Sequence, residues 1–415
     1  MTDTVTPQPA AAEGLPDDPE GRRVLAALDA LLAAHDPRAE TAEEFRGHQF
    51  DAGLAWVHFP EGRGGLGVRP ELQAPVERLL DAAGGPTRNA VGFFIHLAGP
   101  TIVTHGTPGQ CDRFLRPMFT GEELWCQLFS EPGAGSDLAG LACRAERDGD
   151  EWVVNGQKVW NTLAHLADWG LLVTRSDPDA PKHKGMTYFA LRMDSPGVEV
   201  RPLRQITGGA EFNEVYLTDA RIPDADRIGD EGEGWRAALT TLGNERSSIG
   251  SVQSSDPERG SGPIAELVAL WQAAPDHART PVMRDRVTDL WVSAEVLRLN
   301  NLRAGEARRA GNPGPEGSIT KMAFTELHQA MTETTIGLLG PAGLVGYDYA
   351  FTRPDLEFTG LGIDDPQYEF LRARASTIEG GSSQIMRNIL GEQVLGLAGE
   401  PRLDKGIPWR DVPRN

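Results

Sequence analysis

The spacing of apolar residues divides the chain into three regions. Between Gly21 and Ala34 they recur every three or four positions, as on one face of an amphipathic helix, and further helices broken by Gly/Pro loops follow up to Thr120. From Leu124 onward, short β-branched runs alternate with turn residues, which is typical of a small antiparallel sandwich or barrel. Helical spacing returns at Trp235. The pattern therefore predicts helices, then a β region, then helices again.

The β region contains one strong turn signal. Asn155 and Gly156 stand between short apolar runs in the segment from Glu151 to Trp160, so we expect a β-hairpin that turns at this dipeptide. Four further strands are predicted, at Leu171–Thr174, Met186–Met193, Val198–Leu203 and Glu214–Thr218.

Long helices are predicted in the last region. Apolar residues between Val287 and Leu297 form one stripe of a helix, and a second helix is expected from Ile319 to Leu339. A final helix should run from Ser383 to Leu397. Loops rich in Gly are expected from Gly250 to Pro263 and from Gly311 to Gly317.

These regions predict an α+β fold with three domains. We assign residues 20–122 to an N-terminal helical domain, residues 123–232 to a middle antiparallel β domain and residues 233–400 to a C-terminal helical bundle. The flanking segments are predicted to be a disordered N-terminal tail, 1–19, and a C-terminal tail, 401–415.

Charge and cysteine content exclude several classes of protein. The 415 residues include 60 acidic and 40 basic side chains, a formal net charge of −20, which argues against a nucleic-acid or anionic membrane partner. No segment approaches the roughly 18 continuous apolar residues of a membrane span. Three cysteines without CxxC spacing argue against a disulfide framework, so we expect a reduced, cytoplasmic protein.

Two stretches in the β region could carry chemistry. The segment Phe129–Asp137 (FSEPGAGSD) is either a simple chain reversal or a loop whose N–H and hydroxyl groups hold an anionic or polar ligand. In Gln157–Thr162 (QKVWNT) a ring and a hydroxyl alternate, so one face could stack on a planar ligand. Taken alone, the pattern favours Trp160 as a core residue.

Two stretches in the last region also stand out. Glu245 and Arg246 are adjacent on a helix and diverge by about 100°, so they cannot pair well with each other and read first as solvated charges. The bend Thr377–Gln384 (TIEGGSSQ) could simply be a helix N-cap made by Ser382 or Ser383. The histidines, such as His96, His105 and His165, lack metal-ligand spacing, so no metal site is predicted.

Together these stretches resemble the acyl-CoA dehydrogenase family, flavoenzymes with a helical domain, a β domain and a C-terminal four-helix bundle. The resemblance extends from about Gly21 to Gly399. Phe129–Asp137 is similar to the family's signature loop, Gln157–Thr162 to its flavin-stacking strand and Thr377–Leu397 to its second signature. Membership implies FAD as cofactor, an acyl-CoA thioester as substrate and an electron-transfer flavoprotein as the usual acceptor. It also implies a homodimer, a homotetramer or a heterotetramer with a paralogous subunit.

The resemblance assigns cofactor contacts residue by residue. Phe129 and Ser130 would contact the flavin ring from one side, and Trp160 with Thr162 would cover the other. The remaining contacts are Gly135 and Ser136, beside the flavin and the acyl pantetheine arm, and Ser382 and Gln384, near the ribityl and phosphate groups.

The family's reaction removes an α-proton from the thioester while the β-hydrogen leaves as hydride. It needs a carboxylate base and hydrogen bonds to the thioester oxygen. Many members place the base in the second signature, where this chain has Gly380, and Glu379 is one residue out of register. Another branch supplies it from the first helix of the third domain, where Glu245 stands. The resemblance thus implies Glu245 as base, Gly380 as backbone N–H donor to the oxygen, and Arg246 as helix-fixing or substrate-binding residue. Glu379, or no competent base in this chain, are the alternatives.

The chain departs from the family at a second place. Many members use an Arg-x-x-Phe-Gly stretch and a later Gln to reach the neighbouring subunit's FAD. This chain has Ala274–Met283 and Gly337 at those places. Either it makes different contacts or a partner subunit supplies them. Three functions therefore compete: a dehydrogenase that forms a trans-2-enoyl-CoA, a non-catalytic or half-site subunit of a heteromer, and a flavin oxidase on the same scaffold.

Overall fold

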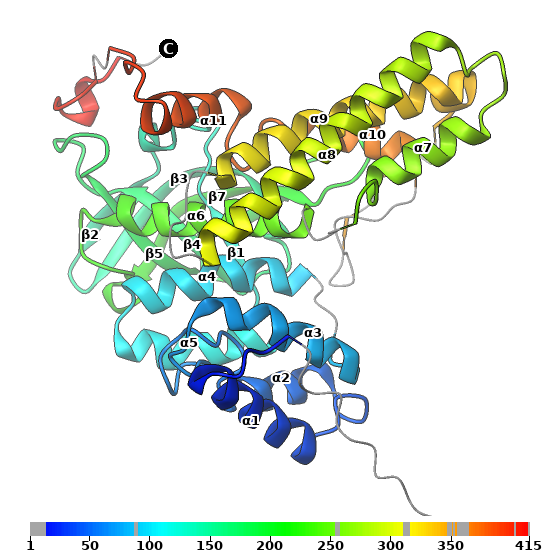
Figure 1. Cartoon of the computed structure of the whole chain (residues 1–415). Coiled ribbons are helices and arrows are strands. Elements are labelled where there is room, and N and C mark those ends of the chain that lie inside the picture. The colour runs from blue at the N-terminus through cyan, green and yellow to red at the C-terminus, as the bar shows by residue number, and fades with distance from the viewer. Residues whose placement is uncertain are drawn as a thin grey trace, which may run out of the picture.

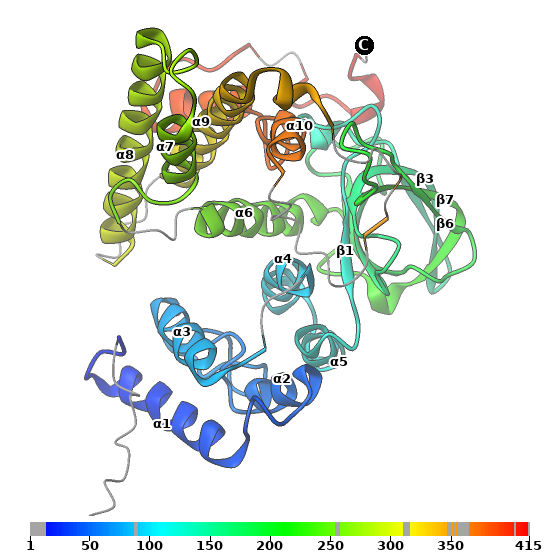
Figure 2. The ribbon, with the colours of Figure 1, turned by 90° about the vertical axis from the view of Figure 1, so that its right-hand side faces the viewer.

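The computed structural model describes residues 14–86, 90–253, 258–309, 316–346, 351, 353–354, 365–401 and 404–413. N-terminal helices, a curled sheet and C-terminal helices follow one another along the chain (Figure 1), which confirms the predicted fold class. Figure 2 shows helix α6 between α4 and the group α7 to α10, with the sheet at one end.

Three of the N-terminal helices, α1, α2 and α5, begin at residues with a strong capping preference. Asp18 caps α1, while Thr41 and Thr107 form capping boxes at the starts of α2 and α5. Leu15 packs against the cluster that buries α1, whereas residues 1–13 of the predicted tail lie outside the described residues. The helices are α1 (Pro19–Ala34), α2 (Ala42–Asp51), α3 (Gln73–Ala83), α4 (Ala90–His105) and α5 (Pro108–Thr120).

The middle of the chain folds into one seven-stranded sheet. Its order is β1-β4-β2-β3-β7-β6, and β5 pairs with β4. Most pairs are antiparallel, but β1 and β2 each run parallel to β4. The four strands predicted after the turn signal are confirmed. The strands are β1 (Trp125–Leu128), β2 (Arg144–Asp148), β3 (Glu151–Thr162), β4 (Trp169–Arg175), β5 (Met186–Arg192), β6 (Val198–Pro202) and β7 (Phe212–Pro223).

The predicted hairpin at Asn155 and Gly156 is wrong. Strand β3 runs straight through this dipeptide, and the chain reverses earlier, at Gly149 and Asp150 between β2 and β3. Gly156 is needed for close packing instead, because a Cβ there would lie 2.7 Å from the Cα, Cβ and Sγ atoms of Cys143. Pairing of β3 with both β2 and β7 overrides the local turn preference.

The C-terminal helices confirm the predicted long elements. The stripe at Val287–Leu297 lies in α8, and α9 ends at Leu339 as expected. The last α-helix ends at Ile389 and continues as a π-helical turn to Val394. The predicted loop from Gly250 begins too early, because α6 extends to Gln253, and residues 254–257 and 311–315 of the two predicted loops lie outside the described residues. None of the helices in the described segments could cross a membrane. The elements are α6 (Gly234–Gln253), α7 (Pro263–Ala273), α8 (Pro281–Arg309), α9 (Glu316–Leu339), α10 (Pro366–Ser376) and α11 (Ser383–Ile389).

The C-terminal segment returns to the sheet domain. Trp409 donates its indole N–H to the carbonyl of Gly140 at 3.3 Å, and the guanidinium of Arg175 lies 4.9 Å from its ring centroid. Lys182 pairs with both Asp137 and Asp404. Residues 404–413 therefore cover the outer side of the loop that follows β1.

A buried ion pair fixes this loop to β3. The ammonium of Lys158 lies 2.8 Å from Glu131 and also donates to the carbonyl of Phe129 at 2.9 Å. Glu131 accepts the backbone N–H groups of Ala142 at 2.7 Å and Cys143 at 2.9 Å. Both ionised groups are buried, so each depends on the other for compensation. The pair thus holds both ends of the loop between β1 and β2.

We expect Lys158→Met to lower the free energy of unfolding by about 3–5 kcal/mol, because it leaves the Glu131 carboxylate buried without its counter-ion. Adding Glu131→Gln should recover part of this loss, since the amide is neutral. Urea unfolding of both single variants and the double variant measures the coupling. The exposed Lys184→Met is the control, expected within about 0.5 kcal/mol of the parent. Strictly additive effects would contradict the coupling.

Candidate active site

Helix α6 brings Glu245 to the carboxyl end of β1. Its Oε2 atom accepts a hydrogen bond from the Gln127 side-chain amide at 3.4 Å. One turn earlier, Thr241 is fully buried and its hydroxyl lies 3.0 Å from the Tyr188 hydroxyl and 2.8 Å from the Thr101 hydroxyl. Burial raises the pKa of Tyr188, so it stays a neutral hydroxyl in this chain of hydrogen bonds. Thr241 and Glu245 are four residues apart, so they share the face of α6 that meets the sheet.

The segment after β1 fixes Phe129 and Ser130. Phe129 is buried with its ring edge against Tyr188, at a centroid distance of 5.8 Å. The carbonyl of Ser130 accepts the N–H of Val159 at 2.9 Å, which ties the loop to β3. Gly135 and Ser136 lie farther along the same loop and are exposed. A Cβ on Gly135 would meet nothing within 4 Å, so this backbone is open to a ligand.

Trp160 leaves the sheet and points outward. The interpretation of Trp160 as a core residue is wrong, because 57% of it is exposed. Its φ of +63° lies at a register shift between Lys158 and Asn161, so a bulge breaks the alternation of β3. Its ring stands on edge against Phe212, with centroids 5.8 Å apart. The half-buried Thr162 lies opposite Phe212 in β7.

Asn161 links the bulge to β1. Its side-chain amide donates to the carbonyl of Gln127 at 2.8 Å, next to the contact that Gln127 makes with Glu245. The Oδ1 atom of Asn161 is buried and accepts no hydrogen bond from any described residue. A buried acceptor without a donor is costly, so a ligand N–H or O–H, or a water molecule, fits this position.

Two glycines in the second signature form a turn that contacts α9. Gly380 and Gly381 have φ values of +62° and +96°, which L side chains rarely adopt. The buried Lys321 donates to the carbonyl of Gly381 at 2.6 Å. Burial lowers the pKa of Lys321, while the negative charges of Glu379 and Glu245 oppose this shift. Lys321 therefore connects this loop electrostatically to Glu245. Within the described ranges, the N–H of Gly380 donates to no residue.

Glu379 is engaged by an arginine. Arg372 contacts its two carboxylate oxygens at 3.0 and 3.1 Å, a bidentate geometry. The guanidinium also lies 3.1 Å from Glu211 and 5.7 Å from the Phe212 ring centroid. Although burial opposes it, the two carboxylates raise the pKa of Arg372, and burial raises that of Glu211. This network joins α10 to Phe212 in β7, whose ring also contacts Trp160.

The last three predicted site residues are Ser382, Gln384 and Arg246. Ser382 caps α11, with its hydroxyl accepting the N–H of Ile385 at 3.3 Å, so the simple N-cap interpretation holds locally. Gln384 is exposed, and the side chain of Arg246 lies outside the described residues. Sequence reasoning missed Gln127, Lys321 and Arg372 because none stands in a recognised motif. Asn161 lies inside a stretch that was singled out, but only tertiary contacts reveal its role.

Sequence profiles of one family match all three regions of the chain. The acyl-CoA dehydrogenase N-terminal domain matches residues 24–122, the middle domain residues 126–220 and the C-terminal domain residues 232–395. These three matches agree with the order of helices, sheet and helices in the structure.

Individual proteins agree with the profiles. Acyl-CoA dehydrogenase IpdE1 of Mycobacterium tuberculosis is 40% identical over 356 residues, which cover 86% of this chain and 87% of that protein. IpdE1 of Mycolicibacterium smegmatis is 36% identical over 369 residues, covering 86% and 88%. A chain of the ChsE4-ChsE5 complex from Mycobacterium tuberculosis superposes with a TM-score of 0.67 at 26% identity, covering 94% of this chain and 99% of its own. The protein therefore belongs to the acyl-CoA dehydrogenase family.

Proposed function

We propose that this chain is an FAD-dependent acyl-CoA dehydrogenase that converts an acyl-CoA thioester into the trans-2-enoyl-CoA, with Glu245 as the base. The contact between Glu245 and Gln127 carries this proposal, because Gln127 lies in β1, which leads directly into the loop of Phe129 and Ser130. The alternative base, Glu379, is held by Arg372 in a bidentate ion pair. Family membership supports the reaction class, and the geometry favours Glu245 over Glu379.

The chain offers groups that fit a flavin. An exposed indole at Trp160, an open backbone at Gly135 and the unpartnered Oδ1 of Asn161 are features expected where a planar, hydrogen-bonding cofactor binds. When bound, FAD supplies the hydride acceptor. The residues proposed to hold it are Phe129, Ser130, Gly135, Ser136, Trp160, Thr162, Ser382 and Gln384.

The protein's own part is to move a proton and hold an oxygen. The carboxylate of Glu245 would take the α-proton of the thioester, while the N–H of Gly380 would donate to the carbonyl oxygen, where negative charge develops. Lys321 holds the Gly381 carbonyl and so fixes the direction of this loop. Its ammonium also interacts electrostatically with Glu245. Gln127 orients the carboxylate, and Arg246 is proposed to contact substrate or fix α6.

A second subunit is also proposed. Helix α8 exposes an apolar stripe of Val292, Val296 and Leu299, which are 50%, 54% and 55% exposed and lie on one helix face. Ala274–Met283 and Gly337 lack the side chains with which many members reach a neighbour's FAD. The related ChsE4-ChsE5 structure contains two different chains. We therefore propose that another acyl-CoA dehydrogenase subunit, identical or paralogous, covers α8, and that an electron-transfer flavoprotein accepts the electrons.

Glu245→Gln should leave flavin content unchanged and slow anaerobic flavin reduction by acyl-CoA by about 10²–10⁴-fold, since a positioned base contributes that much. Stopped-flow absorbance at the flavin band measures the rate. Glu379→Gln is the matched control and should reduce the rate far less. If the Glu245→Gln variant reduces its flavin at the wild-type rate, Glu245 is not the base.

Lys321→Met should move the acid limb of the reduction rate to higher pH. Lys321 interacts electrostatically with Glu245, and a nearby cation favours the ionised form of a carboxylate, so the acid limb should lie at higher pH without it. Lys321→Arg keeps the charge and should retain the parental limb. The profile comes from stopped-flow rates between pH 5 and 9, with circular dichroism to check folding. If the acid limb of the pH–rate profile is the same in the parent, Lys321→Met and Lys321→Arg, the charge of Lys321 does not act on the base.

The visible spectrum of the protein expressed alone tests cofactor and assembly together. We expect a flavin band that bleaches anaerobically with one class among straight-chain, branched and steroid acyl-CoAs. Flavin that appears only after co-expression with a paralogous subunit would instead favour the half-site alternative. Release of peroxide at the turnover rate in air would favour a flavin oxidase over a dehydrogenase.

A further inference from the structure

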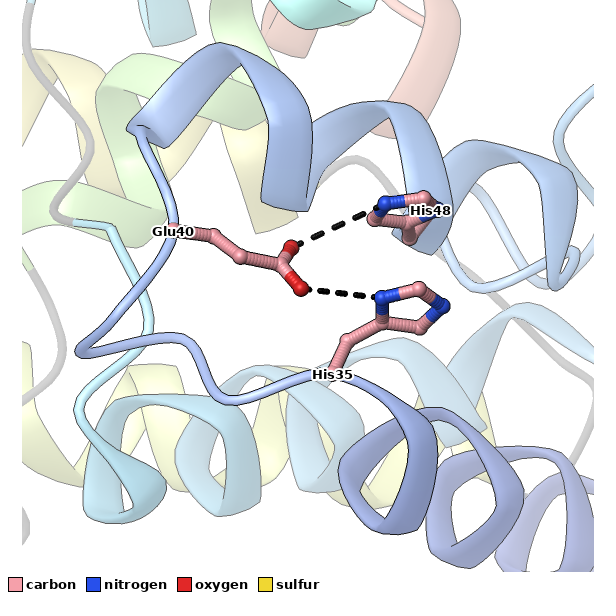
Figure 3. A group of neighbouring side chains, drawn as sticks. All are labelled: His35, Glu40 and His48. Atoms are coloured by element: carbon pink, nitrogen blue, oxygen red, sulfur yellow. Dashed lines mark hydrogen bonds and ion pairs between the residues drawn. The ribbon is translucent and has the colours of Figure 1, made fainter.

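Three potential metal ligands meet where α1 passes into α2, far along the chain from the proposed active site. His35, Glu40 and His48 each offer one ligand atom, and these atoms all lie within 4.8 Å of one another. The Nδ1 atom of His35 is 2.9 Å from one carboxylate oxygen of Glu40, and the Nε2 atom of His48 is 3.7 Å from the other. Figure 3 shows the carboxylate pointing between the two imidazole rings.

Helix ends fix these three positions independently of any ligand. His35 is the C-cap of α1, and its N–H donates to the carbonyl of Leu31 at 2.9 Å. Glu40 directly precedes Thr41, the residue that opens α2 with a capping box. His48 lies in the last turn of α2. The backbone of the cluster is therefore set before any ion binds, which lowers the entropy cost of binding.

The side chains are not satisfied by one another alone. The Oε2 atom of Glu40 is buried and has no hydrogen-bond partner among the described residues, since its contact with His48 is too long for one. The two imidazole rings stack with centroids 3.5 Å apart and planes at 17°. The ring nitrogens therefore lie in the same small space as the carboxylate oxygens.

We propose that His35, Glu40 and His48 form a zinc site that clips α1 to α2. Two imidazole nitrogens and one carboxylate oxygen suit a borderline divalent cation, and zinc accepts three protein ligands with water in the fourth position. Tetrahedral ligands about 2.0–2.1 Å from zinc lie roughly 3.3 Å apart, so modest side-chain rotation closes the present cluster onto an ion. The N-terminal helices carry the site at the opposite side of α4 from α6 (Figure 1).

Titration of the full-length, tag-free protein with Zn²⁺ tests the proposal. After dialysis against a chelator, isothermal titration calorimetry should give one zinc per chain. Co²⁺ as a spectroscopic probe should produce the visible bands of a four- or five-coordinate site. Both signals should be lost in Glu40→Gln and His48→Ala, and both should persist in the control His277→Ala, which removes an exposed histidine elsewhere.

A melting curve separates the site from a folding defect. Because an ion that binds only the folded state stabilises it, saturating Zn²⁺ should raise the melting temperature of the parent and of His277→Ala but not of Glu40→Gln. Glu40→Gln keeps the shape of the side chain, so it tests the site even if His48→Ala fails to fold. No zinc binding by the parent, or equal binding by Glu40→Gln, would overturn the proposal.

Discussion

The active-site side of the sheet depends on the buried ion pair between Lys158 and Glu131. Neither charge could remain buried without the other, and Glu131 also receives the N–H groups of Ala142 and Cys143. The pair therefore fixes the carbonyl of Phe129, the start of β2 and the middle of β3 relative to one another. Two residues beyond Lys158, the bulge turns Trp160 out of the sheet. The buried ion pair and the exposed indole thus lie two residues apart on the same strand.

Contacts across domain boundaries complete the site. Helix α6 is seated by the hydroxyls of Thr241, Tyr188 and Thr101, which come from three different regions of the chain. Arg372 joins α10 to β7 through Glu211 and the ring of Phe212. Because each contact involves buried polar groups, a shift of one domain would leave unpaired groups in the interior. The proposed base and the second signature are consequently held in one frame, rather than on independently moving parts.

The local sequence pattern predicted the strands and helices correctly where runs of apolar residues mark buried elements. It was wrong where one residue suits two different structural roles. The strands β4 to β7 follow from β-branched and apolar runs between turn residues, and helices α8 and α9 follow from apolar spacing. Asn155 and Gly156 carry the chemistry of a turn, yet their strand pairs on both sides and the glycine makes room for Cys143. Trp160 has the composition of a core residue, but a bulge decides which way it points. Such choices depend on neighbours distant in sequence.

By itself, the sequence determined the order of helices, sheet and helices and the family, because apolar periodicity and three ordered motifs are local properties of the chain. It could also name Glu245 and Glu379 as alternative bases. Only the tertiary structure showed that Arg372 forms an ion pair with Glu379 and that Gln127 and Lys321 lie near Glu245. It also showed that the side chains of His35, Glu40 and His48 come together. The physical reason is that hydrogen bonding, charge compensation and metal ligation depend on distances of a few ångströms between residues that no sequence spacing relates.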